Sequence, residues 1–285
     1  MKFGIAATVL AGLQGLVYAQ LPPYEGQYGV GYMTIEVPVQ NMRSISPQRI
    51  LATSQPAFTL QTVLFSIYYP ADKNNQSTKA SPPWITNLDL ISAGIAAGSN
   101  GSVDQSLVTL GLGALAGSAV ILAYADVPIV GDTSYPVYVF SHGDTSLPEW
   151  YSHYLGSIAA DGNVVVAITH RDGSNAGSQI ILKGQEGARN VTYITPSSVL
   201  PRVNSTGLAM IQREFRQAEV EDVVYVLKEI NDGRGEAVYQ NNSRGDGAGL
   251  GDWSGRLDLN ALVIGGHSFG ATSAVGLARE SQERR

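Results

Sequence analysis

The sequence predicts an α/β protein whose central sheet is mostly parallel and is covered by helices on both faces. Segments 136–144, 163–173 and 261–266 are unbroken apolar runs that end in polar or glycine residues. Such runs are typical of parallel strands that are buried on both faces. Segments with helical periodicity separate them, and strands that alternate with helices form parallel sheets.

The composition indicates one large globular domain. The chain has 285 residues, of which 44% are hydrophobic and 15% are charged, so it is long enough for a substantial core. Its net charge is −6 and no basic block exceeds two residues, which disfavours nucleic acid as a partner. The absence of cysteine excludes disulfides, thiolate metal sites and a cysteine nucleophile.

The amino terminus resembles a removable secretory signal. Lys2 is followed by an apolar run over 3–17, and Val17-Tyr18-Ala19 places small residues at the −3 and −1 positions. A transmembrane anchor is the alternative, but glycines interrupt the short run. We therefore expect a signal peptide over 1–19, a secreted domain over 20–285, and glycans on some of five Asn-x-Ser/Thr sequons, at Asn75, Asn100, Asn190, Asn204 and Asn241.

The other elements follow from periodicity. Segments 32–40 and 60–72 alternate apolar and polar residues as strands do. Segment 149–162 resembles a helix that ends at a glycine, and segment 209–230 has apolar residues on one helical stripe. Segment 231–255 contains seven glycines, which predicts a long surface loop.

A charge-free segment over 105–125 is long enough to cross a bilayer. It lies, however, between two strands that should belong to one sheet, and a spanning helix would separate them. We therefore predict a buried or interfacial helix over the active-site face, with a lipid surface as its possible contact.

The motif that carries chemistry lies near the end of the chain. Gly266-His267-Ser268-Phe269-Gly270 follows an apolar strand and precedes a helical stretch, which is the context of a nucleophile elbow. This context predicts Ser268 as a nucleophile and the backbone N–H of Phe269 as an oxyanion donor. The alternative is an ordinary serine in a glycine turn.

A second loop completes the predicted oxyanion site. Segment 136–144 ends in His142-Gly143-Asp144, and the backbone N–H of Asp144 can serve as the other donor. We expect His142 to pack beneath this loop. No metal is predicted, and no dinucleotide cofactor either, because the Gly-x-Gly-x-x-Ala match over 111–116 lacks a surrounding βαβ unit.

Ser268 also needs a base and an acid. In α/β-hydrolases the triad follows the chain order Ser, Asp, His, and the residues after Ser268 include neither Asp nor His. We therefore expect the acid and the histidine beyond Arg285, so that the fold stops after the nucleophile helix. A chain that ended there would leave 261–266 at a sheet edge and would be inactive. The alternative is that one of the histidines present serves instead: His142, His153, His170 or His267.

These motifs resemble the platelet-activating factor acetylhydrolase family in order and spacing. The resemblance rests on "PVYVFSHGD", "NVVVAITHRDGS", "REFRQAEVEDVVYVL" and "RLDLNALVIGGHSFGAT", and it covers residues 30–285. It implies a secreted α/β-hydrolase that removes a short acyl chain from the second position of a glycerophospholipid without a cofactor. It also implies Ser268 as nucleophile and Phe269 and Asp144 as oxyanion donors. The chain departs from the family at Asp144, where an apolar residue is more usual, and at Ala271, where a further glycine is common.

Two other functions stay open at this point. A carboxylesterase or polyesterase of the same fold would share the elbow, because the elbow does not bind the leaving group. A non-catalytic lipid-surface protein would keep the apolar segment 105–125 on a scaffold with an incomplete triad. No feature of the sequence specifies an oligomeric state.

Overall fold

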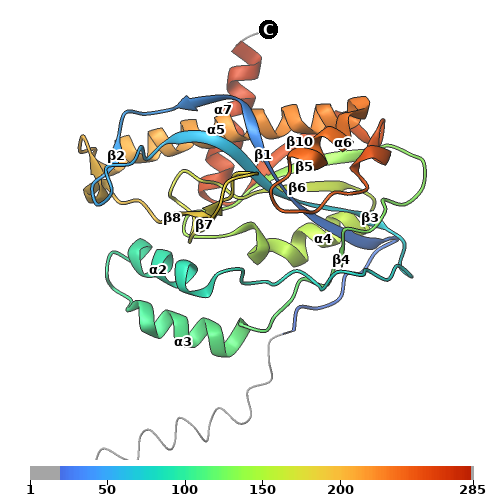
Figure 1. Cartoon of the computed structure of the whole chain (residues 1–285), viewed down its shortest axis with the longest axis horizontal. Coiled ribbons are helices and arrows are strands. Elements are labelled where there is room, and N and C mark those ends of the chain that lie inside the picture. Colours follow the sequence, from blue (N-terminus) through green and yellow to red (C-terminus); the bar gives the residue numbers. More distant parts are fainter. Residues whose placement is uncertain (1–19, 284–285) are drawn as a thin grey trace, which may run out of the picture.

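The computed structural model describes residues 20–283, so the predicted signal peptide over 1–19 lies outside the described residues. Its centre is a six-stranded sheet with the order β10-β5-β6-β3-β1-β4 (Figure 1). The strands span Gly29–Ser44 (β1), Thr59–Ala71 (β3), Tyr124–Ala125 (β4), Tyr135–Ser141 (β5), Val164–Ile168 (β6) and Leu257–Gly266 (β10).

Within this sheet, β3 alone runs against the other strands. β5 is parallel to both β10 and β6, and β4 is parallel to β1. β3 is antiparallel to both of its neighbours, β6 and β1, so these two neighbours point the same way. The prediction of a mostly parallel central sheet is therefore confirmed.

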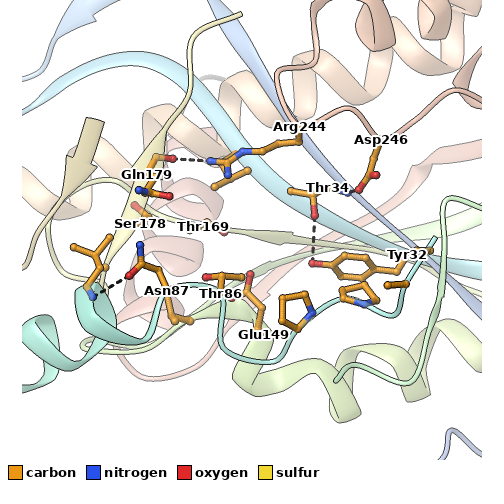
Figure 2. Close-up of a pocket in the computed structure, with 18 of the residues that line it drawn as sticks. Tyr32, Thr34, Thr86, Asn87, Glu149, Thr169, Ser178, Gln179, Arg244 and Asp246 are labelled. Carbon is orange, nitrogen blue, oxygen red and sulfur yellow. Dashed lines mark hydrogen bonds between the residues drawn. The ribbon is translucent and has the colours of Figure 1, made fainter. Parts of the chain in front are cut away.

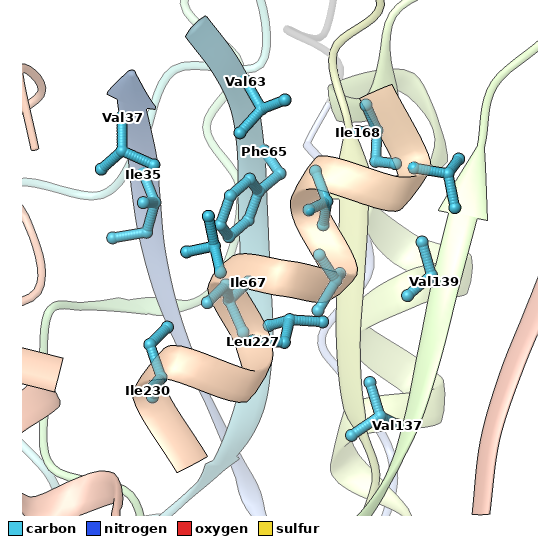
Figure 3. Packing of buried hydrophobic residues seen from close by; sticks show 14 of the residues in the cluster. Ile35, Val37, Val63, Phe65, Ile67, Val137, Val139, Ile168, Leu227 and Ile230 are labelled. Atoms are coloured by element: carbon cyan, nitrogen blue, oxygen red, sulfur yellow. The ribbon is translucent and has the colours of Figure 1, made fainter. Parts of the chain in front are cut away.

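Helix α5 (Ser205–Glu229) covers one face of the sheet. In Figure 3, the helical segment that carries Leu227 and the following Ile230 crosses in front of the strands that carry Phe65, Ile67 and Val139. All five side chains are buried. The apolar stripe that the sequence predicted for this helix therefore faces the sheet, and its burial is what attaches the helix.

The opposite face is covered by α4 (Ser152–Ala160), which continues a 3-10 turn, η2 (Pro148–Tyr151). Leu155 of α4 packs against Tyr68 and Val165 of the sheet. Helix α7 (Phe269–Glu283) follows β10 and lies against α5, so α5 and α7 lie on one side of the sheet and α4 on the other (Figure 1). Helices on both faces were predicted and are confirmed.

Helices α2 (Leu88–Gly98) and α3 (Gln105–Ala116) form a pair beyond α4. The prediction of a single helix over 105–125 is wrong, since α3 ends at Ala116. Beyond it the backbone pairs with segment 82–84: Ile121 N–H donates to the carbonyl of Pro82 over 2.8 Å. Among the described residues, no helix combines the length and apolarity that a membrane crossing needs.

The glycine-rich segment 231–255 is not the surface loop that its composition predicted. It contains a π-helical turn (Ile230–Arg234), helix α6 (Gly235–Asn241) and a 3-10 turn (Leu250–Trp253). Leu250 and Trp253 are buried in the main core. A Cβ on Gly235 would lie only 1.8 Å from the Leu250 carbonyl oxygen, so here glycine permits close packing rather than a loop.

Two small sheets complete the fold. β2 (Arg49–Ile50) pairs with β9 (Val199–Leu200), which follows a 3-10 turn (Pro196–Ser198), and β7 (Ser178–Ile180) pairs with β8 (Arg189–Val191). In the main sheet, β10 pairs only with β5 within residues 20–283. Val263 of β10 is accordingly 59% exposed.

Candidate active site

Ser268 occupies a tight turn between β10 and α7. β10 ends at Gly266 and α7 begins at Phe269, and Ser268 has φ 52°. Left-handed backbone is uncommon for a residue with a side chain and marks local strain. Ser268 is exposed, so the strand-to-helix turn presents its hydroxyl at the surface as the elbow motif requires.

The glycines on either side of Ser268 are needed for close approach. Gly266 pairs with Ser141 at the end of β5. A Cβ would lie 2.6 Å from the Ser141 carbonyl oxygen if placed on Gly266, and 2.1 Å from it if placed on Gly270. The small residues two before and two after Ser268 therefore let strand and helix meet against β5.

The loop after β5 lies beside this turn. A Cβ on Gly143 would lie 3.4 Å from the Cβ of Ser268, and His267 N–H donates to the Ser141 carbonyl over 3.1 Å. Asp144 follows Gly143 directly. The structure therefore brings together the loop of Asp144, Ser268 and Phe269, the three residues that the sequence singled out.

Tyr193 fixes the orientation of the Asp144 side chain. Asp144 is exposed, and the Tyr193 hydroxyl donates to its carboxylate at 3.3 Å from Oδ1 and 3.1 Å from Oδ2. Desolvation raises the pKa of Asp144, and the Tyr193 hydrogen bond opposes that rise. The next residue, Thr145, donates its N–H to the Ser174 carbonyl over 2.7 Å, which anchors the loop.

Tyr151 connects the two loops from the side of η2. Its hydroxyl lies 2.9 Å from Nδ1 of His267 and accepts the N–H of Gly143 over 3.4 Å. The phenol therefore links the residue before Ser268 to the residue before Asp144.

A hydrogen-bonded relay of serine, histidine and glutamate lies beneath the site. Ser141 Oγ is 2.7 Å from His170 Nε2, and His170 Nδ1 is 2.6 Å from Glu219 Oε2. The groups are those of a hydrolytic triad, but Ser141 is 1% exposed and the other two are 0% exposed. No ester can reach Ser141, so this relay supports the end of β5. Burial lowers the pKa of His170 and raises that of Glu219, which favours the neutral form of each.

Arg216 of α5 contacts both the relay and the loops around Ser268, and its Nη1 donates to Ser141 Oγ over 3.4 Å. Its Nε is 2.8 Å from Asp172 Oδ2, and its Nη1 donates to the His142 carbonyl over 2.6 Å. Its Cζ lies 4.6 Å from the centroid of the Phe269 ring. One fully buried guanidinium therefore contacts both the loop of Asp144 and Phe269.

His142 packs beneath the loop, as the sequence predicts. Its Nδ1 lies 2.8 Å from the Gly143 carbonyl oxygen, and its Nε2 accepts the His170 N–H over 3.3 Å. Burial and the nearby Arg216 lower the pKa of His142 to about 3. The imidazole is therefore neutral at physiological pH.

None of the four histidines hydrogen-bonds to the Ser268 hydroxyl within the described part of the chain. His153 stacks on Tyr24 instead, with ring centroids 6.0 Å apart. Sequence reasoning missed the roles of Arg216 and Glu219. The sequence did contain an indication of these roles, because two charged residues three positions apart interrupt the apolar stripe of α5.

A separate polar cavity of 320 Å³ lies between the sheet and segment 79–90 (Figure 2). It is lined by Glu149, Arg244 and Asp246, among others, but not by Ser268. Arg244 lies 2.6 Å from Glu36, and Lys79 lies 2.7 Å from Asp246. The basic groups of this cavity are therefore already balanced by carboxylates. In residues 20–283, no three carboxylate or imidazole groups converge as metal ligands would.

The sheet, its covering helices and the strand-turn-helix geometry at Ser268 define the α/β-hydrolase class. Within that class, the chain belongs to the platelet-activating factor acetylhydrolase, isoform II family, whose model matches residues 15–285.

Individual proteins agree with this assignment. The chain is 26% identical to the platelet-activating factor acetylhydrolase of Cavia porcellus over 242 residues, which is 80% of this chain and 49% of that protein. It is 28% identical to the same enzyme of Canis lupus familiaris over 173 residues, 59% of this chain and 37% of that protein. The chain thus spans about half the length, or less, of these relatives.

A solved structure shares the fold. The ferulic acid esterase of Streptomyces cinnamoneus matches with a TM-score of 0.53 at 15% identity, covering 93% of this chain and 59% of that one. At this identity the likeness concerns the fold alone.

Proposed function

We propose that the protein is a secreted serine esterase that hydrolyses short acyl esters at the second position of glycerophospholipids. The observation that carries the proposal is the exposed, left-handed Ser268 beside the loop of Asp144. Membership of the acetylhydrolase family supports the substrate class.

In the proposed mechanism, Ser268 Oγ attacks the ester carbonyl. The oxyanion of the tetrahedral intermediate accepts hydrogen bonds from the backbone N–H groups of Phe269 and Asp144. A general base takes the Ser268 proton and then donates it to the lysophospholipid oxygen as the ester C–O bond breaks. The same base takes a proton from water, which hydrolyses the acyl-enzyme and releases the short carboxylic acid and the free Ser268 hydroxyl. Residues 20–283 provide no histidine bonded to Ser268, so the base and the acid are left unassigned there.

We further propose that α3 contacts the lipid surface. The helix carries no charged residue, and Leu107, Leu110 and Leu115 are 67%, 68% and 54% exposed. Such an apolar surface on a helix favours interfacial binding. Its partner α2 ends beside the site, because a Cβ on Gly98 would lie 2.7 Å from Thr145 Oγ1.

The predicted signal peptide over 1–19 and the five sequons support the proposal that the protein is secreted. Asn100, Asn190, Asn204 and Asn241 are exposed and Asn75 is half-buried. We expect glycans on Asn100, Asn204 and Asn241, because Asn190 lines a cavity between the 50–59 segment and the β7–β8 hairpin. Expression in a eukaryotic host, followed by deglycosylation and mass measurement of the medium fraction, tests this. A product that stays in the cells and carries no glycan would contradict it.

A substrate panel tests the activity. We expect hydrolysis of 1-alkyl-2-acetyl-glycerophosphocholine to exceed hydrolysis of a long-chain phosphatidylcholine, with both measured against p-nitrophenyl acetate. Turnover of the simple ester without turnover of either phospholipid would favour the carboxylesterase instead.

A further inference from the structure

A second cavity, of 260 Å³, lies between the 50–59 segment and the β7–β8 hairpin. We call it the arginine cavity, because Arg171 and Arg189 line it and no aspartate or glutamate does. Its other polar lining comes from side chains that can donate hydrogen bonds, Thr53, Gln55, Thr59, Asn190 and Thr192.

Arg189 brings a positive charge that is not neutralised within the described residues. Its Nη2 donates to the neutral Gln61 Oε1 over 2.8 Å, and no carboxylate of residues 20–283 pairs with it. The side chain is half-buried, and desolvation lowers its pKa. A partly desolvated cation without a counter-charge is costly, so the site favours an anion.

Arg171 adds an unused donor. It is 3% exposed, and its Nε has no hydrogen-bond partner. Its Nη2 lies 2.6 Å from Glu36, which also serves Arg244 at 2.6 Å. One carboxylate therefore faces two guanidinium groups. Burial raises the pKa of the neighbouring Glu219, which favours its neutral form.

This charge balance separates the arginine cavity from the polar cavity of Figure 2. There, Lys79 and Arg244 each have a carboxylate within 2.7 Å. At the arginine cavity, Arg171 shares Glu36 with Arg244, and Arg189 has no carboxylate partner among residues 20–283. The excess charge there is therefore positive, and the free donors are guanidinium and hydroxyl groups. Planar guanidinium donors suit oxyanions, phosphate above all.

We propose that the arginine cavity binds a phosphate group through Arg189 and Arg171, at a site distinct from Ser268. The group is either free inorganic phosphate or the phosphodiester of a glycerophospholipid head group. The residues that follow β8 connect the cavity to the proposed active site. Thr192 lines the cavity, and the next residue, Tyr193, donates to Asp144.

Isothermal titration calorimetry with the intact protein tests the proposal at constant ionic strength. Inorganic phosphate and glycerophosphocholine are titrated separately into the unaltered protein, Arg189→Gln and Arg202→Gln. Arg202 is exposed and follows β9, the strand that pairs with Ile50 of the cavity lining, so its variant matches the change in net charge. Arg189→Gln removes only the contact with Gln61 and avoids the buried pair between Arg171 and Glu36, whose loss could prevent folding.

We expect Arg189→Gln to weaken binding about tenfold or more, the effect of one charge-assisted hydrogen bond. Arg202→Gln should bind as the unaltered protein does. If Arg189→Gln weakens the binding of inorganic phosphate but not that of glycerophosphocholine, the ligand is free phosphate. If it weakens the binding of glycerophosphocholine, the ligand is the phospholipid head group.

No binding of either probe, or equal affinities in all three proteins, would overturn the proposal, as would an equal loss in Arg202→Gln. The same titrations with Ser268→Ala distinguish a failure of this proposal from a failure of the esterase assignment. Phosphate binding should persist there, whatever the variant does to hydrolysis.

Discussion

The guanidinium of Arg216 stacks on the ring of Phe269, with Cζ 4.6 Å from the ring centroid. The same group donates to the His142 carbonyl at 2.6 Å. Phe269 and the loop after His142 are far apart in the sequence, yet the backbone N–H groups of Phe269 and Asp144 are the two proposed oxyanion donors. We therefore predict that Arg216, which is fully buried, is a positioning residue for both donors.

Replacing Arg216 with Met should lower both stability and turnover. The change leaves Asp172 buried without its partner, at a cost of about 3–5 kcal/mol in the free energy of unfolding. If the protein folds, kcat should fall on the order of 10²-fold, as small displacements of catalytic groups do, with KM nearly unchanged. Steady-state kinetics and urea unfolding give both values.

Arg213→Met provides the control for Arg216→Met, because Arg213 is exposed on the same helix. Equal kinetics for the two variants, or a change in KM alone, would contradict a positioning role.

Gly270→Ala should disrupt the elbow. The added Cβ would meet the Ser141 carbonyl oxygen at 2.1 Å, so β10 and α7 would have to separate. We expect a loss of about 2–3 kcal/mol, as for overpacking elsewhere, together with loss of activity. Gly249→Ala is the matched control, since nothing lies within 4 Å of its Cβ position. Thermal unfolding curves that coincide for the two variants would show that the close approach is unimportant.

Much of the fold could be predicted because it depends on short-range patterns. Apolar runs such as 163–173 identify strands buried on both faces, and the stripe of 209–230 identifies α5. The elbow was recognisable because its glycines and serine are adjacent in sequence. The structure adds the reason for those glycines, which is the Ser141 carbonyl, and Ser141 is distant in sequence.

Stability should fall on acidification because of His142. Its pKa is lowered from 6.5 to about 3, so between these values the unfolded chain binds a proton that the native protein does not. The free energy of unfolding therefore rises with pH in this window, by about 1.4 kcal/mol per pH unit for one such group, and this contribution is complete above pH 6.5.

His142→Gln should reduce the slope of the free energy of unfolding against pH by the contribution of one proton. His170, whose pKa is also lowered, acts in the same direction, and Glu219, whose pKa is raised, acts in the opposite one. His170 and Glu219 are unchanged in the variant, so their effects cancel in the comparison with the unaltered protein. Urea unfolding at several pH values between about 4 and 7 gives the slope of the free energy of unfolding against pH for each protein. His153→Gln alters an exposed histidine and serves as control. Parallel slopes for the unaltered protein and His142→Gln would refute the linkage.

Leu110→Asp on α3 should weaken activity on vesicles about tenfold, because one apolar anchor is lost from the lipid contact. Activity on soluble p-nitrophenyl acetate and the unfolding temperature should hardly change, since Leu110 is 68% exposed. Met210→Asp changes a 58% exposed residue on α5 and should leave both activities intact. Equal losses on vesicles and soluble ester would show that α3 has no lipid contact.

The parts that sequence reasoning missed depend on contacts between distant segments. Nothing in the composition of 231–255 reveals that Trp253 packs on Tyr69, with ring centroids 4.9 Å apart. The end of α3 likewise depends on backbone pairing with 82–84. The role of Arg216 requires Asp172, His142 and Phe269 together. His142 and Asp172 follow β5 and β6, and Phe269 is the first residue of α7.

The nucleophile assignment is tested most directly by Ser268→Ala. Ser268 is exposed and its hydroxyl accepts no partner among residues 20–283, so the variant should fold as the unaltered protein does. In a full-length form of the protein that includes the expected acid and histidine, hydrolysis of 1-alkyl-2-acetyl-glycerophosphocholine should fall by about 10⁴-fold, because the members of a hydrolytic site act as a unit. A variant with an unchanged unfolding temperature and no measurable turnover is the result we predict. Retention of more than about a tenth of the original rate, far above what oxyanion stabilisation alone supplies, would contradict the assignment of Ser268.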